Sequence, residues 1–598
     1  MMEVDDAVYT TEYDVVVVGT GIVESIVAAS LARAGQKILH LDTNEYYGSD
    51  FASLPLHQFE EWMTAPVQEV AQRPHAFSLT NAFRCTLLHH AKDESFTPRS
   101  SSFNLDIQPK MLLSNSPLVD VLVHSGVGRY LDFMAMQGTF MYSAQPQNKN
   151  PPIWEVPCSK TEVFKSKLNV LEKRHLMKFL QFVADYGEVD VTTLNERDLT
   201  SSRALKRPQN KQHDVATASF DQYESFTDVL AKHFKLSAAL QQVVLYAVLL
   251  ETSASPVVPL STPNSLNAIY NFVTSIGKFA PSPYLTPMYG ISEVAQSFCR
   301  LGAVYNGTYI LRTPVAHLNI QDTTDECGGA VKCVGLSTAE GLSFRAKHVV
   351  LNASAHGHSL GYTPQSAVLR GIFIVGSSIQ PGVDRLVVVI PPGEIAHPNE
   401  ALSTSAVHVL QMDSAMGVCA SGYFLIHVTT VVPLATPNQD LVSYMESIAA
   451  CLGQIKAVWS SIFTIPVVAK IASGQGANVA NVFVCPSPPT LDTTLAECVD
   501  AARAVFRAMC PDESVAFLPK SASEQAMQDD CHEDSDVALL DQAVQLLQTA
   551  ESGGVEARAT TTETEQDLAS MAAINADEPP RSPPLHNAAT EYKYSFDL

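Results

Sequence analysis

Positive charge and long hydrophobic runs are both scarce in this sequence. Its 598 residues carry 38 Lys and Arg against 62 Asp and Glu, a formal net charge of −24. Such a balance argues against nucleic-acid binding and against a basic surface made for membranes. No apolar run approaches the ~18 residues of a membrane-spanning helix, and the first residues, MMEVDDAVY, lack the basic and apolar parts of a secretory signal. We therefore expect a cytoplasmic protein.

Cysteine pairs at short spacing are also missing. The chain has 11 Cys, an odd number, and no C-x-x-C motif. This usage is typical of free thiols in a reducing compartment, and it predicts neither a disulfide framework nor a metal site. Hydrophobic residues make up 46% and charged residues 17% of the chain, as in globular proteins. Because 598 residues exceed what one core can hold, we expect two or three domains.

The stretch from Glu12 to Leu54 organises the rest of the sequence. The apolar run Val15 to Val18 predicts a strand buried on both faces of a parallel sheet, and Gly19 and Gly21 follow where the chain must turn tightly. A helical pattern comes next, and a second strand closes on Asp42. Strand, Gly-x-Gly, helix, strand and acid form the βαβ dinucleotide fingerprint, in which Asp42 has the spacing of a ribose-binding carboxylate.

One position of this fingerprint departs from the pattern. The third glycine of G-x-G-x-x-G is Glu24. A tiny residue is needed there for close packing, and a carboxylate in the first helical turn competes with a pyrophosphate for the helix N-terminus. At ~4 Å and an effective dielectric near 20, the repulsion is on the order of 4 kcal/mol. We expect a retained fold that has lost its flavin; the alternative is that Glu24 turns into solvent at no cost.

The middle of the chain alternates between irregular and helical patterns. Pro55 to Ser102 is polar with little periodicity, and we interpret it as a long insertion or loop. Residues from about 110 to 260 predict a helical module inserted into the α/β domain. Its signals are Leu118, Val121 and Leu122 on one helical face, a capping box at Ser159 and Glu162, the run Leu176, Phe179, Leu180 and Val183, and helices at Phe226–Phe234 and Leu236–Leu250. Such apolar faces are usually core; a lipid groove between helices is the alternative, and periodicity does not decide between them.

A second informative stretch runs from Ser282 to Val315. A helix is predicted to start near Glu293, and Arg300 lies two helical turns farther on, so both side chains can share one face. Two charges on one face are normally a solvated surface. Asn306-Gly307 is a hairpin signal, and Thr308 to Leu311 predicts a strand.

The remainder predicts a mainly antiparallel sheet and a tail. Short β-branched runs dominate from about residue 330 to 485, Asn481 to Val484 indicates a late buried strand, and Leu495 to Met509 a helix. From Lys520 to Leu598 the chain has 16 acids against 4 bases. Apart from a possible helix at Val537–Leu547, this composition predicts disorder.

Three blocks of the sequence together resemble the family of Rab GDP dissociation inhibitors and Rab escort proteins. They are GTGIVES…HLDTNEYYG, FNLDIQPKMLLSN…RYLDF and MYGISEVAQSFCRLGAVYNGTYIL. The resemblance runs, with interruptions, from about residue 12 to 520, and the blocks are specific together although Gly-x-Gly alone is weak. It implies an α/β (α+β mixed) protein: a flavin-monooxygenase-like Rossmann domain with a mixed sheet, plus an inserted α-helical domain that shelters geranylgeranyl groups. No working cofactor is implied, only a vestigial FAD-type site.

The resemblance also implies domain boundaries and residue roles. Domain I would comprise 1–109 and 261–520, the helical domain II 110–260, and the acidic tail 521–598. The implied Rab-binding platform is Tyr47, Glu293, Arg300, Thr308 and Ile310, and Lys278 to Leu285, with Lys278 and Tyr284, would be a mobile effector loop. The degenerate nucleotide motif is Gly19, Gly21, Glu24 and Asp42, and the candidates for prenyl binding are Leu118, Leu122, Phe179 and Val183.

Differences from flavin proteins and from dissociation inhibitors then favour one functional alternative over the others. Flavin relatives would show an Arg and a Gly-Gly where this chain has Asn44 to Gly48, and a Gly-Asp where it has Cys485-Pro486. The segment 55–102, the long tail and the endings NVFVCPSPP and CPDESVAFLP resemble escort proteins, although Ile291-Ser292 replaces the usual x-Gly before Glu293. We expect a non-catalytic escort of GDP-bound Rab GTPases that serves a Rab geranylgeranyltransferase heterodimer and contacts membranes transiently. The alternatives are a Rab GDP dissociation inhibitor and an FAD-dependent oxidoreductase.

Overall fold

The first sheet builds on the predicted βαβ unit. In the computed structural model, residues 12–64, 76–78, 85–145, 151–157, 160–166, 168–194, 220, 222–253, 260–323, 330–356, 361–453, 455–470, 479, 481–485, 495–519 and 593–595 are described. Eight strands join in the order β12-β2-β1-β15-β14-β13-β4, with β21 beside β15. They are β1 (Glu12–Val18), β2 (Ile38–Leu41), β4 (Ala76–Ser78), β12 (Thr308–Ile310), β13 (Val315–Thr323), β14 (Ala330–Thr338), β15 (Ser343–Asn352) and β21 (Val482–Cys485).

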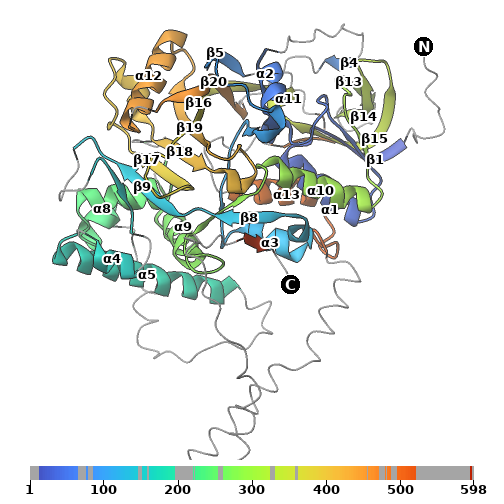
Figure 1. Cartoon of the computed structure of the whole chain (residues 1–598). Helices are drawn as coiled ribbons and strands as arrows, with labels where there is room; N and C mark the ends of the chain where they lie inside the picture. The colour runs from blue at the N-terminus through green and yellow to red at the C-terminus, as the bar shows by residue number, and fades with distance from the viewer. Residues whose placement is uncertain are drawn as a thin grey trace, which may run out of the picture. The chain divides into compact units, whose positions relative to one another are not determined.

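The strands around the glycine loop are parallel, as the fingerprint predicts. β1 pairs in parallel with β2 and β15, and β2 with β12. Three helices pack together on this sheet: α1 (Ile22–Arg33), α10 (Ser292–Val304) and α13 (Ala496–Met509) (Figure 1). All 12 residues of α1 are buried, because the sheet covers one side and α10, α13 and α3 (Pro117–His124) cover the rest.

The second sheet is antiparallel except at one edge. Its order is β10-β9-β17-β18-β19-β16-β20-β5, and only β9 pairs in parallel, with β17. Its strands are β5 (Thr86–Lys92), β9 (Gly138–Tyr142), β10 (Ile153–Glu155), β16 (Tyr362–Val375), β17 (Leu386–Ile390), β18 (Val407–Met412), β19 (Phe424–Pro433) and β20 (Ala457–Lys470). α12 (Asn438–Cys451) packs on one face.

The segment from 55 to 102 is not the irregular loop that its polar composition predicts. It contains α2 (Leu56–Thr64), whose Phe59 is fully buried against Trp459 and Phe463, and β5, which forms the edge of the second sheet. The periodicity is weak because α2 is short and because β5 lies at a sheet edge with mostly exposed side chains.

Two smaller sheets join the large ones. β3 (Ser53–Pro55) pairs with β6 (Asn104–Asp106), and the other sheet has the order β22-β8-β11-β7. Its members are β7 (Leu112–Leu113), β8 (Asp132–Ala135), β11 (Tyr284–Pro287) and β22 (Lys593–Ser595). The prediction of a disordered tail is therefore wrong for 593–595, which add a strand to β8. Val537–Leu547 lies outside the described residues.

The helical module occupies a narrower range than predicted, and its helices gather at the lower left in Figure 1. Strands β8, β9 and β10 fall inside 110–260, and α3 packs with α1, so that range is not one helical domain. The module consists of α4 (Lys160–Lys165), α5 (Val170–Leu194), α7 (Phe226–Asp228), η4 (Val229–His233), α8 (Ala238–Gln242), η5 (Val243–Val248) and α9 (Thr262–Ser275). The stretches η4 and η5 are π-helical, and such turns are frequent at functional sites.

Two local predictions at helix ends have different outcomes. Asn306-Gly307 does not form a hairpin: Asn306 takes a left-handed conformation (φ 65°) after α10, and β12 then runs parallel to β2. The same residue pair suits a hairpin turn and a helix C-terminus, because both need a positive φ. Ser159 of the predicted capping box lies outside the described residues. In the part of the chain that the structure describes, every helix is too short or too polar to cross a membrane.

Candidate functional site

The backbone N–H of Thr20, between the two glycines of the loop, is already hydrogen-bonded to side chains of the protein. The Thr20 N–H donates to Asp42 Oδ2 and to Ser49 Oγ, at 2.8 Å each. The Thr20 hydroxyl also donates to Asp42 Oδ2 at 2.5 Å, and Asn44 donates to Oδ1 of the same carboxylate. Asp42 therefore organises the loop, where the fingerprint would have it bind a ribose.

Glu24 fills the space above the second glycine. Its side chain is 2% exposed, and its Oε1 accepts a hydrogen bond from Asn352 Nδ2 at 2.9 Å. A Cβ placed on Gly21 would lie 2.4 Å from Glu24 Oε2, so the carboxyl group lies directly over the glycine backbone. The alternative that Glu24 turns into solvent is therefore wrong.

Burial changes the reason why a pyrophosphate is excluded. Desolvation, reinforced by the nearby Asp50 carboxyl, raises the pKa of Glu24 to about 8. At neutral pH the group is mostly protonated, and the charge repulsion expected from the sequence is therefore largely absent. The obstacles to a pyrophosphate are instead the volume of the Glu24 side chain and the Thr20 N–H, which already donates to Asp42. In this conformation the Glu24 side chain leaves no room for a pyrophosphate over Gly21.

The predicted platform residues gather around α10 and the strand that follows it. Glu293, Gln296, Arg300 and Val304 lie at spacings of three and four along α10, and we call these four side chains the α10 stripe. Glu293 is half-buried and burial raises its pKa, whereas Arg300 is exposed. Among the described residues neither forms an ion pair, and Glu293 Oε1 accepts a hydrogen bond from Gln296 Nε2 at 3.4 Å.

The three other platform residues adjoin this helix. Tyr47 stacks edge-on against Tyr309, with 6.4 Å between ring centroids, and burial next to Cys299 of α10 raises its pKa. Thr308 and Ile310 flank Tyr309 on β12 and are half-buried. The Tyr309 ring packs on Gly302, where an added Cβ would lie 2.2 Å from the hydroxyl oxygen. The structure therefore places the five predicted residues on or beside α10 and β12, but Ile310 packs with Leu39 and Leu41 on the face of the sheet opposite α10.

Two aromatic residues of the same surface were not predicted. Tyr130, which is 43% exposed, lies under the Arg300 guanidinium at 4.2 Å from the ring centroid and holds it flat. Tyr289, 50% exposed, precedes α10 with a positive φ of 66°. The sequence places both in the family-like blocks, but an exposed aromatic has no signal that distinguishes it from a buried one.

The predicted effector loop divides into an accessible and an inaccessible part. Lys278 is exposed and donates to Asn115 Oδ1 at 3.1 Å. Tyr284 is fully buried in β11 and packs against Phe272. Assigning Tyr284 to a mobile, partner-binding loop is therefore wrong for this conformation, because its strand β11 pairs with β7 on one side and with β8 on the other.

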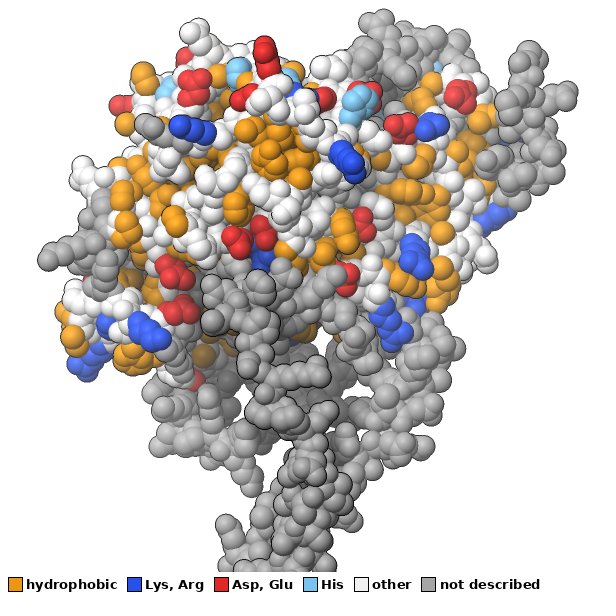
Figure 2. Space-filling model, in the orientation of Figure 1, with side chains coloured by type: hydrophobic (Ala, Val, Ile, Leu, Met, Phe, Trp, Pro, Cys, Tyr) orange, Lys and Arg blue, Asp and Glu red, His pale blue; other side chains and the backbone are white. Residues whose placement is uncertain are grey.

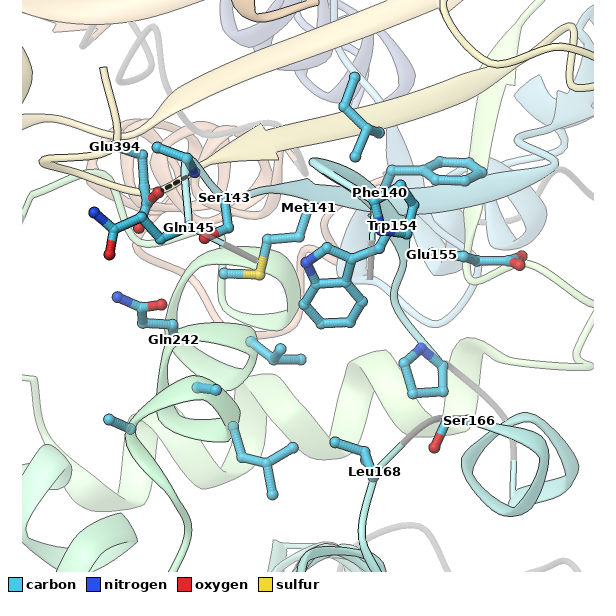
Figure 3. A pocket seen from close by; sticks show the side chains of 18 of the residues that line it. Phe140, Met141, Ser143, Gln145, Trp154, Glu155, Ser166, Leu168, Gln242 and Glu394 are labelled. Atoms are coloured by element: carbon cyan, nitrogen blue, oxygen red, sulfur yellow. Dashed lines mark hydrogen bonds between the residues drawn. The ribbon is translucent and has the colours of Figure 1, made fainter. Parts of the chain in front are cut away.

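Two adjoining cavities border the helical module. The wider one, of about 680 Å³, lies between the edge strands β9 and β10 and the helices α4 and α8 (Figure 3). The narrower one, of about 50 Å³, is lined almost wholly by apolar side chains of α5, α8, η5 and α9, and we call it the apolar slot. Trp154 and Leu168 line both, and Figure 3 shows the Trp154 indole between the strands and the helices.

The four prenyl-binding candidates separate into two places. Phe179 lines the apolar slot, and Val183 lies in the same helical core. Leu118 and Leu122 pack instead with α1, α10 and α13, so they cannot line the same cavity. The periodicity of their helix was predicted correctly, but periodicity does not say which core a helix covers. No three His, Cys, Asp or Glu side chains of the described ranges are placed to hold a metal ion.

Three known proteins are similar to this chain over most of its length. A Rab GDP-dissociation inhibitor of Saccharomyces cerevisiae is 27% identical over 441 residues, 73% of this chain and 83% of that protein. A Drosophila melanogaster protein named Rab proteins geranylgeranyltransferase component A is 29% identical over 537 residues, 85% of this chain and 90% of that protein. The solved structure of a Rab GDI from Plasmodium falciparum superposes with a TM-score of 0.61 at 22% identity, covering 84% and 98% of the two chains.

The family match spans the glycine loop, the α10 stripe and the helical module. The sequence matches the GDP dissociation inhibitor family over residues 9–487, well over half of the chain. The resemblance of the three sequence blocks and the predicted α/β fold are thereby confirmed. The chain belongs to the GDP dissociation inhibitor family.

Proposed function

We propose that this chain is a Rab escort protein: it binds newly made, GDP-bound Rab GTPases, presents them to a Rab geranylgeranyltransferase and delivers the lipidated product to membranes. One observation carries the choice of escort over inhibitor. The similarity to the protein named geranylgeranyltransferase component A covers 85% of this chain, against 73% for the yeast inhibitor.

The region after the family match supports this choice. Residues 495–519 follow the end of the match at 487 and form α13 and a short extension. Cys498, Val499 and Phe506 of α13 are fully buried against α1, and Phe517 of the extension packs edge-on against Phe506. The first core of this chain therefore extends beyond the end of the family match.

The α10 stripe and the adjoining tyrosines are the surface we assign to the GTPase. An acid, a base and exposed aromatics within one helix face suit a partner with charged switch regions, since complementary charges give specificity and Tyr and Arg give affinity. GDP-bound Rab is expected to bind more tightly than the GTP form, because the switch regions are ordered differently in the two states.

The apolar slot is the place we assign to the geranylgeranyl group. As it stands, about 50 Å³ holds only roughly four water molecules, so the lipid must separate the slot walls, for example α5 from α9. Neighbouring π-helical turns in η4 and η5 provide less regular helix packing, which favours such movement. The wider cavity beside it leads to the surface.

We further propose that the chain neither binds a flavin nor carries out a chemical step. Glu24 and the engaged Thr20 amide exclude the pyrophosphate of a dinucleotide. Burial raises the pKa of the Cys299 and Cys419 thiols to about 12, so neither is a thiolate nucleophile at neutral pH. Purified protein with one flavin chromophore per chain would contradict this part of the proposal.

A reconstituted prenylation assay tests the escort function. Unprenylated Rab, the transferase and labelled geranylgeranyl donor are combined with and without this chain. We expect lipid to reach Rab only in its presence, and expect the chain to bind unprenylated GDP-bound Rab directly. If the chain extracts prenylated Rab from membranes but supports no transfer, it is an inhibitor and the escort function is wrong.

A further inference from the structure

Exposed apolar side chains gather where α4 passes into α5. Phe164, Val170 and Leu171 are 66%, 85% and 60% exposed, among the highest values for large hydrophobic side chains in the described part of the chain. Large apolar groups exposed together cost solvation free energy and mark sites of interaction. We call these three, with the cations described below, the α4–α5 patch.

The backbone holds this patch in a fixed shape. Asn169 caps α5: Glu172 N–H donates to Asn169 Oδ1 at 2.9 Å, and Asn169 N–H donates back to Glu172 Oε2 at 3.2 Å. The Lys173 ammonium donates to the Phe164 carbonyl at 2.7 Å and ties the end of α4 to α5. The apolar side chains are therefore presented by a capped helix end.

Basic side chains surround the apolar ones. Lys165, Arg174 and Lys178 are exposed, and Val170, Arg174 and Lys178 share one face of α5 at four-residue spacing. The segment 160–181 has six Lys or Arg and two Glu, in a chain whose net charge is −24. In Figure 2, basic and hydrophobic side chains lie together at the lower left, where Figure 1 places α4 and α5.

The patch borders the mouth of the proposed lipid site. Lys165 and Ser166 line the wide cavity, and Leu168 lines both that cavity and the apolar slot. The buried face of α5, with Leu176 and Phe179, forms the slot wall, while its exposed face belongs to the patch. One helix thus separates the slot from the surface where a lipid must leave it.

We propose that the α4–α5 patch docks this protein on an anionic lipid surface. Shallow insertion of a few apolar side chains is weak alone, and basic side chains near the headgroups add the second signal that membrane association needs. The arrangement places the slot mouth against the bilayer, so a lipid can pass without crossing water. The inference rests on the proposed function only in its purpose, the delivery of a lipidated protein.

Vesicle binding by the full chain alone tests the proposal without a GTPase or a transferase. Phosphatidylcholine vesicles with about a third of phosphatidylserine are compared with pure phosphatidylcholine. We expect binding to the anionic vesicles that falls with added salt. The triple variant K165Q/R174Q/K178Q should lose on the order of a hundredfold in partition, at about fivefold per charge. Val170→Ser with Leu171→Ser should also weaken binding, and a thermal melt checks that both variants fold.

Matched variants elsewhere make the result specific. R99Q/K332Q/K456Q removes three exposed cations outside the patch, and Leu434→Ser removes an exposed leucine outside it. Both should bind vesicles like the unaltered chain. Equal loss in the control triple would show a general charge effect and overturn the proposal. Unchanged vesicle binding of both patch variants, with loss of transferase binding instead, would assign the patch to a protein partner and overturn it as well.

Discussion

The glycine loop and the apolar slot differ in how their interiors are filled. In the loop, Glu24 lies over Gly21, and Thr20 donates its backbone amide to Asp42 and Ser49. In the slot, apolar side chains from four helical segments leave space unfilled and open to a wider cavity. A side chain of the protein fills the loop, whereas the slot keeps an unfilled cavity.

This difference shows how a βαβ unit can be stable when its glycine loop is filled by the protein's own groups. A βαβ unit needs its glycine turn, its buried helix and its polar loop groups satisfied, and the protein's own side chains meet all three needs. The slot, by contrast, has no polar group to satisfy and so tolerates a cavity whose cost is only lost packing.

The largest expected effect concerns Glu24 in the filled glycine loop and the pH dependence of the free energy of unfolding. The folded pKa of Glu24 is about 8 against an ordinary value of 4.5, so the folded state holds a proton that the unfolded state loses between these values. This contribution to stability is complete below pH 4.5 and is lost as the pH rises to 8. Glu24→Gln keeps the Asn352 hydrogen bond without titrating, and should be more stable than the unaltered chain by roughly 4 kcal/mol at pH 8.

Urea unfolding at pH 5, 6.5 and 8 measures this difference. The nearby Asp50 carboxyl, whose pKa burial also raises, titrates in both proteins and should largely cancel in the comparison. Glu340→Gln, at an exposed turn, is the control and should follow the unaltered chain at every pH. If Glu24→Gln shows the same pH dependence as the unaltered chain, the carboxyl is ionised when folded and the steric explanation of the closed loop fails.

The second prediction would break the comparison by closing the slot as Glu24 closes the loop. Val273→Trp places a large side chain among the slot residues of α9. It should weaken binding of geranylgeranylated Rab about 100-fold, some 2.7 kcal/mol, while unprenylated Rab binds as before. Leu122→Ala in the first core is the control: it should cost ~2–5 kcal/mol of stability but leave the ratio of the two affinities unchanged. Equal loss for both forms of Rab with Val273→Trp would place the lipid elsewhere.

Periodicity and spacing predicted the helices and strands of this fold better than they predicted which segments those elements pack against. The first two strands with α1, and the helices α10 and α13, follow from local patterns, since each depends on residues close in sequence. Phe179 and Leu122 both lie on correctly predicted helices, yet they face different cores, because that choice depends on contacts between distant segments. Likewise, spacing identified Glu24 as a departure, but only the fold shows that it is buried and mostly neutral.

The third prediction concerns the open surface of α10. Arg300→Ala removes an exposed cation that packs on the Tyr130 ring. It should weaken the binding of GDP-bound Rab by about 2 kcal/mol, roughly 30-fold, and leave the melting temperature of the chain unchanged. Tyr130→Ala should cause part of the same loss. In the double variant the losses should not add, because the ring acts by positioning the guanidinium. Titration calorimetry of the four proteins measures the coupling; strictly additive losses would mean that Tyr130 and Arg300 contact the partner independently.

The smallest effect separates the two ends of the proposed effector loop. Lys278 is exposed but is already engaged with Asn115, and its ammonium lies 3.9 Å from the Asp120 carboxylate. Exposed pairs of this kind contribute at most ~1 kcal/mol, so Lys278→Ala should weaken Rab binding no more than about fivefold. Tyr284→Phe removes a hydroxyl from a fully buried ring and should leave Rab affinity unchanged within twofold, whatever its effect on stability. If Tyr284→Phe alters Rab affinity more than Lys278→Ala does, β11 must open when the partner binds, and the boundary between closed core and open surface then lies farther into the small sheet than this conformation places it.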